Sequence, residues 1–168
     1  MSNTFATVEE VIKTLDLSAH VEGGYFRRTY QAEERDRLNT AEGSRFLLTS
    51  IYYLLTRDQT IGHWNLNKSD ILHYYHLGDP IEYTLIHPDG RLEKIVMGSD
   101  ITSGEKLQLH VKGGIWKRAK LLNSNAGYGL ISEAVSPGFE YEDMTLGDVD
   151  RLSKIFPQHE TIIKAYNQ

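Results

Sequence analysis

The feature that most limits the fold of this chain is a series of short β-rich segments with only turns between them. The segments are residues 45–56, 61–65, 71–77, 81–87, 91–97, 106–111, 115–122 and 128–135. Turn-forming sequences such as Gly78-Asp79-Pro80 and Gly113-Gly114 separate them. Because no helical segment lies between these strands, the pattern predicts an all-β antiparallel sandwich or barrel rather than βαβ units.

Short helices are expected at both ends of the chain. Thr7 and Glu10 have the spacing of a capping box, and apolar residues at helical spacing follow them. Near the other end, helix-spaced apolar residues on both sides of Pro157 predict two short helices. Without a linker or repeat, residues 1–168 are predicted to form a single domain, in which the polar residues 31–44 form a mobile surface loop.

Composition excludes several classes of function. The net charge is −5 and no run of Lys or Arg could follow a phosphate backbone, so nucleic acid is not an expected partner. The absence of cysteine excludes disulfides, thiolate metal sites and cysteine nucleophiles. No stretch approaches the roughly 18 apolar residues of a membrane span, and the N-terminus is acidic, so a cytoplasmic protein is expected.

Residues 45–55 are apolar on both alternate faces of their predicted strand. A barrel interior can cover only one of these faces, which predicts a homodimer unless the N-terminal helix covers the other face.

The densest polar cluster lies in two predicted strands and the turn between them. It contains His63, Asn65, Asp70, His73, Tyr74, Tyr75 and His76. Residues two apart on a strand share a face, which pairs His63 with Asn65 and His73 with Tyr75. Such a cluster is typical of a metal-site neighbourhood, but asparagine is a poor ligand for transition metals. Ordinary surface or interface positions on strands explain these side chains as well.

Several landmarks, in this order along the chain, resemble an uncharacterised branch of the cupin superfamily. They are His20-Val21-Glu22-Gly23-Gly24-Tyr25-Phe26-Arg27, Ser50-Ile51-Tyr52-Tyr53-Leu54-Leu55, Gly78-Asp79-Pro80, Val135-Ser136-Pro137-Gly138-Phe139 and Phe156-Pro157-Gln158-His159. The resemblance implies a double-stranded β-helix, or jelly-roll, barrel that is commonly dimeric. It is related in shape to sugar-nucleotide epimerases and seed storage proteins.

The metal-binding motifs of cupins are mostly lost. The first motif usually supplies two His residues and a Glu, and here His63 keeps the first place while Asn65 and Ile71 replace the others. Trp116 stands where the second motif usually supplies its His. No tightly bound metal and no cofactor are therefore expected, because a stable site needs about three good ligands.

Three functions remain open at this stage. The first is a metal-independent isomerase or epimerase for a small, sugar-like molecule, with His63 as general base and Tyr75 or Tyr52 as acid. In this hypothesis Arg27 binds an anionic group of the ligand. The other pocket residues would then be Asn65, His73 and Trp116.

The second possible function is a non-catalytic binding or sensing module that uses the same pocket. The third is a metal-dependent oxygenase or decarboxylase with His63, His73 and His76 as rearranged ligands.

Overall fold

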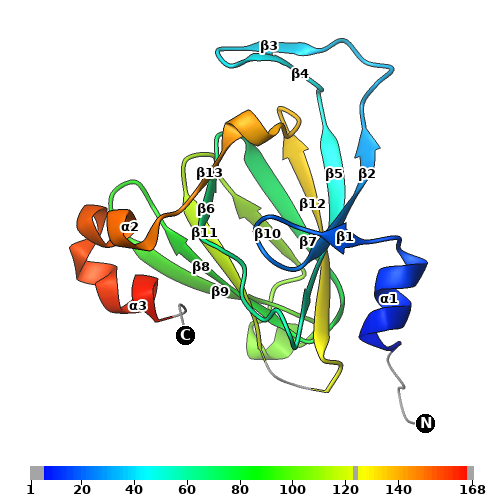
Figure 1. Cartoon of the computed structure of the whole chain (residues 1–168), viewed down its shortest axis with the longest axis vertical. Helices are drawn as coiled ribbons and strands as arrows, with labels where there is room; N and C mark the ends of the chain where they lie inside the picture. Colours follow the sequence, from blue (N-terminus) through cyan, green and yellow to red (C-terminus); the bar gives the residue numbers. More distant parts are fainter. Residues whose placement is uncertain (1–5, 123–124, 166–168) are drawn as a thin grey trace.

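The computed structural model describes residues 6–122 and 125–165 and arranges most of them in two facing antiparallel sheets (Figure 1). The first sheet has six strands, in the spatial order β1 (Ser18–Ala19), β2 (Tyr25–Gln31), β5 (Thr49–Thr56), β12 (Tyr128–Ser136), β7 (Asp70–Gly78) and β10 (Gln108–Val111). The second sheet has five strands, in the order β13 (Met144–Leu146), β6 (Asn65–Asn67), β11 (Trp116–Leu121), β8 (Ile81–Ile86) and β9 (Leu92–Met97).

The hydrophobic core lies between these two sheets. Tyr53 and Ile131 come from the first sheet and Tyr83 and Leu121 from the second, and all four belong to one buried cluster. Inward side chains alternate with outward ones along each strand, as the two-residue period of β-structure requires. The predicted all-β barrel with short terminal helices is therefore confirmed.

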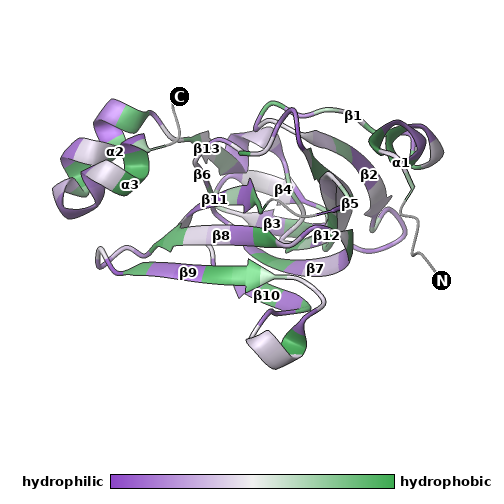
Figure 2. Cartoon of the chain, turned by 90° about the horizontal axis from the view of Figure 1, so that it is seen from below, coloured by the Kyte–Doolittle hydropathy of each residue, from purple (hydrophilic) through white to green (hydrophobic). Residues whose placement is uncertain are grey.

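The helix α1 (Val8–Thr14) covers the outer face of the first sheet (Figure 2). Its predicted capping box is present, since Thr7 and Glu10 each receive a hydrogen bond from the other's backbone N–H. Val11 of the helix packs in one buried cluster with Leu54 of β5 and with Tyr128 of β12. The chain itself thus covers the second apolar face of β5, and the homodimer stays a prediction.

A two-stranded ribbon occupies the second half of segment 31–44, which the sequence predicts as a surface loop. Its strands are β3 (Leu38–Thr40) and β4 (Gly43–Arg45). Arg45 forms a buried ion pair with Asp143, with Nε 2.6 Å from Oδ2 and Nη2 3.0 Å from Oδ1. The sequence prediction missed this ribbon, because the polar residues 38–45 form their own backbone ladder and the Arg45 ion pair anchors its end. Asp143 is the last residue of the 3-10 helix η2 (Tyr141–Asp143).

The two predicted C-terminal helices are confirmed as α2 (Val149–Ile155) and α3 (Glu160–Lys164), joined by the 3-10 helix η3 (Pro157–His159). They pack on the outer face of the second sheet, where Leu152, Phe156 and Ile163 bury Trp64. The Arg118 guanidinium lies 4.4 Å from the centre of a Trp64 ring. None of the described helices is both long enough and apolar enough to span a membrane.

We predict that Gly78→Ala destabilises the protein much more than Gly104→Ala. Gly104 follows the 3-10 helix η1 (Ile101–Ser103). The two glycines have φ angles of 99° and 95°, so alanine costs about 1 kcal/mol at either position from backbone strain. A Cβ at position 78 would also overlap the carbonyl oxygen of Tyr128, whereas no atom lies within 4 Å of one at position 104. Urea unfolding should show a further loss of about 2 kcal/mol for Gly78→Ala. Equal losses would contradict this explanation.

Candidate functional site

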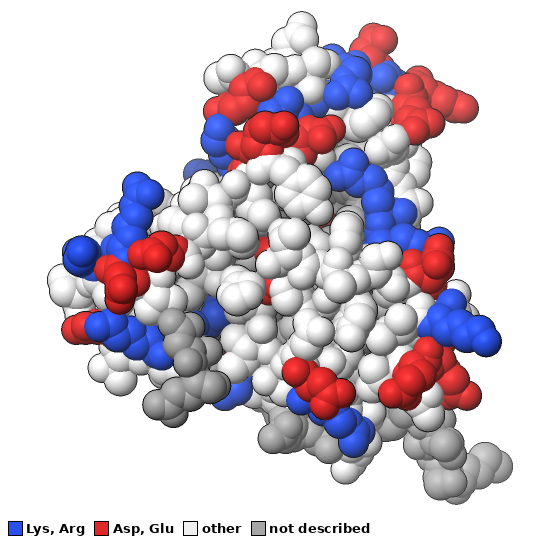
Figure 3. Space-filling model, in the orientation of Figure 1, with Lys and Arg blue, Asp and Glu red and all other residues white. Residues whose placement is uncertain are grey.

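A cavity of about 260 Å³ opens between the sheets at the end of the barrel where β12 finishes and η2 crosses. One part of its wall is apolar and consists of Phe26, Ile51, Ile71, Val135 and Phe139. Its polar part consists of His20, Glu22, Asn67 and Glu133, and Arg28, Glu140 and Tyr141 also line it. In Figure 3 the centre of the visible face has few charged side chains, and acidic atoms show between uncharged ones. The cavity therefore combines an apolar wall with a few carboxylates, as small-molecule sites often do.

Glu133 is the ionised carboxylate of this site. Its Oε1 lies 3.1 Å from Nδ1 of His73 on the neighbouring strand and 3.7 Å from Nζ of Lys117 on the opposite sheet. Burial opposes the charge of Glu133, but the attraction of Lys117 and His73 outweighs it and lowers its pKa to about 2. Burial lowers the pKa of His73 against the attraction of Glu133. Because an ionised carboxylate only accepts hydrogen bonds, Nδ1 of His73 is the atom that donates to Glu133.

Glu22 behaves in the opposite way. Burial raises its pKa from 4.5 to about 7, while Lys117 pulls the value down and Glu133 pushes it up. Its Oε2 accepts a hydrogen bond of 2.9 Å from Nδ2 of Asn65. A carboxyl group with such a pKa exchanges its proton near neutral pH, which is the property that general acid–base catalysis needs.

Some of the residues predicted from the sequence lie close to this pair of carboxylates. Asn65 contacts Glu22 and His73 contacts Glu133, as described above. His63 precedes β6 with an exposed side chain, and it lines a separate small pocket together with Glu22 and Lys117. The backbone N–H of His63 donates to the carbonyl oxygen of Glu22 at 2.7 Å. The catalytic role predicted for His63 stays a hypothesis.

The structure places Arg27 and Tyr52 away from the cavity, which corrects the expected pocket. Arg28, the next residue on β2, lines the cavity, and alternation along the strand turns Arg27 to the opposite face. Tyr52 lies on the outer face of β5, where it packs against the α1 cluster and its ring centre is 5.9 Å from that of His76.

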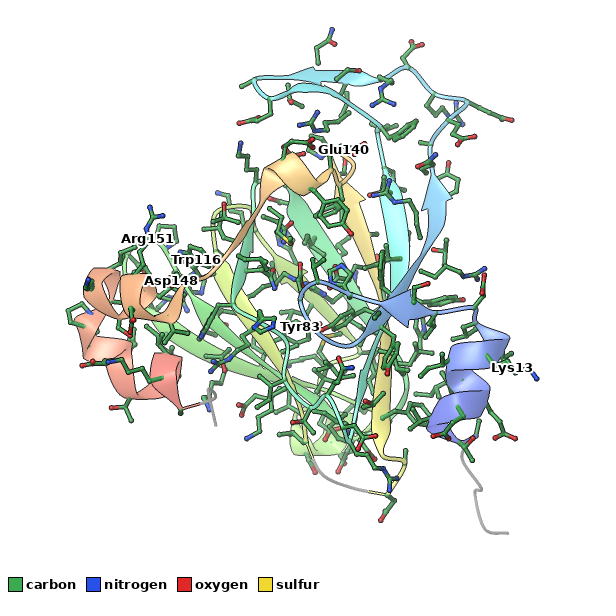
Figure 4. All side chains as sticks on the ribbon, viewed as in Figure 1. Lys13, Tyr83, Trp116, Glu140, Asp148 and Arg151 are labelled. Carbon is green, nitrogen blue, oxygen red and sulfur yellow. The ribbon has the colours of Figure 1, made fainter. Side chains whose placement is uncertain are left out.

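Trp116 and Tyr75 are also separate from the cavity. Trp116 packs beside the C-terminal helices, whereas Tyr83 lies inside the barrel (Figure 4). The inward residue of β11 is the next one, Lys117, so the motif position that Trp116 occupies faces outward in this chain. Tyr75 packs against the core and donates a 2.6 Å hydrogen bond to the carbonyl oxygen of Gly78.

The side chains of this site do not fit a metal ion. In the parts of the chain that the structure describes, no three His, Asp or Glu side chains are grouped as metal ligands. His73 is buried inside the barrel and His76 is exposed on the outer face of β7, so these two cannot bind one ion. At Glu133, the ammonium group of Lys117 supplies the positive charge that a cation would bring. The rearranged set of His63, His73 and His76 is therefore wrong.

A barrel of two facing antiparallel sheets with a pocket at one end is the architecture of the cupins. The sequence match identifies one family within the cupins. Residues 9–147 match the family model described as cupin superfamily, domain of unknown function 985. This chain belongs to that family, which confirms the resemblance seen in the sequence.

Relatives of this chain span several groups of organisms. The chain is 37% identical over 151 residues to the uncharacterized protein YML079W of Saccharomyces cerevisiae, which covers 83% of this chain and 75% of the yeast protein. A hypothetical protein from Leishmania major is 32% identical, with a TM-score of 0.89 over 95% of this chain and 98% of that one. Protein SO0799 from Shewanella oneidensis is 30% identical, with a TM-score of 0.85 over 98% and 99% of the two chains.

A more distant likeness extends to oxalate decarboxylase from Bacillus subtilis. The identity is 13% and the TM-score 0.56, over 83% of this chain and 34% of that enzyme. This comparison shows the shared cupin fold.

Glu22, Lys117 and Glu133 are absent from the residues predicted from the sequence. One signal could have found Glu133, because it is a single carboxylate within the otherwise uncharged segment 128–136. A charge in a central strand is paired when it is buried. Glu22 lies within the landmark His20 to Arg27, but the turn around it hides the direction of its side chain.

We predict that the stability of the protein falls between about pH 4.5 and 7 because of Glu22. In this range the folded state keeps a proton that the unfolded chain has lost, so the free energy of unfolding decreases as pH rises. Glu133 acts in the opposite sense, because its stabilisation is lost as pH falls from 4.5 towards 2. Glu22→Gln should remove the first effect, which amounts to about 2–3 kcal/mol.

Urea unfolding at pH 5 and pH 7.5 measures this difference. Glu140→Gln, at another carboxylate that lines the cavity, is the control and should keep the pH dependence of the unmodified protein. Identical pH dependence in Glu22→Gln would rule out the raised pKa.

Proposed function

We propose that this protein is a metal-independent enzyme that transfers a proton on a small, sugar-like molecule, as an isomerase or epimerase does. One observation carries the proposal. Glu22, a carboxyl group with a pKa raised to about 7, lines a cavity together with the permanently ionised Glu133. Two carboxyl groups whose environments push their pKa values apart are a recurring arrangement in acid–base catalysis.

The proposed chemistry is removal and return of a proton next to a carbonyl group. Ionised Glu22 takes the proton from carbon. Neutral Glu22 then returns it to the neighbouring carbon, or to the same carbon after the intermediate has turned its other face towards Glu22. The ammonium group of Lys117 lines a separate small pocket that Glu22 and Glu133 also line, and its positive charge supports the negative charge that develops on the carbonyl oxygen.

Two features support a hydroxylated ligand with one apolar face. The wall formed by Ile51, Ile71 and Val135 offers no hydrogen-bonding side chain, and it suits the C–H face of a ring. Asn67 lines the same cavity, and its buried Oδ1 has no hydrogen-bond partner in the described part of the chain. A ligand hydroxyl that donates to this oxygen would remove the cost of leaving it unpaired.

We predict that Glu22→Gln abolishes proton exchange on the substrate. The protein is incubated in D₂O with a panel of aldoses, ketoses and their phosphates, and NMR follows the loss of the C–H signal next to the carbonyl. At least one compound should exchange, and the rate should fall by a factor of about 100 or more in Glu22→Gln. His63→Ala is the comparison variant, because the sequence alone favours His63 as the base.

The outcomes of this experiment separate the candidate functions. Loss of exchange in His63→Ala with full activity in Glu22→Gln would transfer the role of base to His63. Saturable binding of a panel compound without any exchange would overturn the enzymatic proposal and favour the binding or sensing module.

We predict that the pH dependence of the exchange reaction follows the ionisation of Glu22. Because the base must be ionised to take a proton, kcat/KM should rise with pH and level off above about pH 7. Steady-state rates between pH 5 and 9 test this expectation. A rate that falls through this range would show that Glu22 is not the base.

A further inference from the structure

Two asparagine side chains form a chain of hydrogen bonds that ends at the carboxyl group of Glu22. The amide groups of both asparagines have a single orientation that fits these hydrogen bonds. Nδ2 of Asn65 lies 2.9 Å from Oε2 of Glu22 and 3.1 Å from the carbonyl oxygen of His63. A backbone carbonyl can only accept a hydrogen bond, so the Asn65 atom beside it must be the NH₂ group. This assigns the amide of Asn65 without ambiguity between its oxygen and nitrogen.

Asn67 extends the same chain of hydrogen bonds. Its Nδ2 donates to Oδ1 of Asn65 at 3.3 Å, and it can do so only because Asn65 already points its NH₂ group at Glu22. Asn65 and Asn67 are both buried and lie two residues apart on β6, so they share one face of the strand. Each amide therefore holds the next in place.

The backbone of Glu22 is fixed as firmly as its carboxyl group. Its N–H donates to Nδ1 of His20 at 3.1 Å, and its carbonyl oxygen accepts from the N–H of His63 at 2.7 Å. The next residue, Gly23, accepts a 3.0 Å hydrogen bond from the hydroxyl of Tyr53. The position of the Glu22 carboxyl group thus depends on anchored neighbours on both of its sides.

We propose that Asn65 is a positioning residue, because it holds Oε2 of Glu22 as an acceptor and so leaves Oε1 as the atom that carries the transferable proton. Asn67 keeps Asn65 in this orientation. Oε1 has no hydrogen-bond partner among the residues described, and Glu22 lines the cavity. This inference rests on the proposed function, and it adds that the reacting atom of the substrate lies beside Oε1.

The ionisation of Glu22 also depends on the titratable groups that surround it, and these must be kept constant in a test. They are His20 after β1, Tyr53 on β5, His63 before β6, His73 on β7, Tyr83 on β8, Lys117 on β11 and Glu133 on β12. Substitution of Asn65 changes none of these groups and alters no charge.

The test measures the pKa of Glu22 in Asn65→Leu. Infrared spectroscopy monitors the C=O band of the protonated carboxyl group, and the band that is missing in Glu22→Gln belongs to Glu22. The lost hydrogen bond stabilises the ionised carboxylate, so the pKa of Glu22 should rise by about one unit. Its C=O stretch should also move to higher frequency. Asn67→Leu should produce a smaller shift in the same direction, because Asn65 is still held by the carbonyl of His63.

Thr49→Val is the matched control. It removes one hydrogen bond, which the N–H of Phe139 donates to Oγ1 of Thr49 in another part of the same cavity, and it should leave the pKa and the C=O stretch of Glu22 unchanged. Unchanged pKa and stretch of Glu22 in folded Asn65→Leu would overturn the proposal.

A second measurement needs no substitution. In the labelled, unmodified protein the side-chain NH₂ resonances of Asn65 should shift with the same pKa as Glu22. If Glu22 titrates near 7 and these resonances stay constant, the positioning role fails while the proposed function stands. If no carboxyl group titrates near 7, the proposed function fails first.

Discussion

The ion pair between Glu133 and Lys117 joins the two sheets across the interior of the barrel, and the site depends on it. Glu133 belongs to β12, which pairs with both β5 and β7 and is thus an inner strand of the first sheet. Lys117 belongs to β11 on the opposite sheet, and His73 of β7 completes the set. A charge this close to the core costs several kcal/mol unless it is paired, so the three strands must keep this register.

This pairing also sets the difference between the two carboxyl groups of the cavity. Lys117 and His73 keep Glu133 ionised. Burial is the main cause of the raised pKa of Glu22, and the charge of Glu133 adds to it. Among the residues that the structure describes, the carboxyl group of Glu22 forms no ion pair and accepts a hydrogen bond from the neutral amide of Asn65. Direct pairing with a cation and burial without one thus have opposite effects on the pKa values of two chemically identical groups that line one cavity.

The fold could be predicted from the sequence because alternation of side chains and turn residues are local signals. The site could be predicted only in part. Asn65 and His73, two residues that the sequence assigns to the pocket, lie beside the carboxylates. Which residues of β2 face inward depends on its pairing with β5, and a shift of one residue in that register places Arg27 instead of Arg28 at the cavity. The sequence assigns Trp116 to the pocket because it stands at a motif position, but the motif does not show the direction of its side chain, which packs beside the C-terminal helices. The partners of Glu133 come from two other strands, and no local pattern shows that they meet.

The raised pKa of Glu22 has a consequence for the thermodynamics of ligand uptake. At neutral pH this group is close to half protonated, so a ligand that prefers either form changes the number of protons bound to the protein. The heat measured on mixing then includes the ionisation enthalpy of the buffer. Titration calorimetry in two buffers with different ionisation enthalpies would count that proton directly, and its sign would show which form of Glu22 meets the ligand.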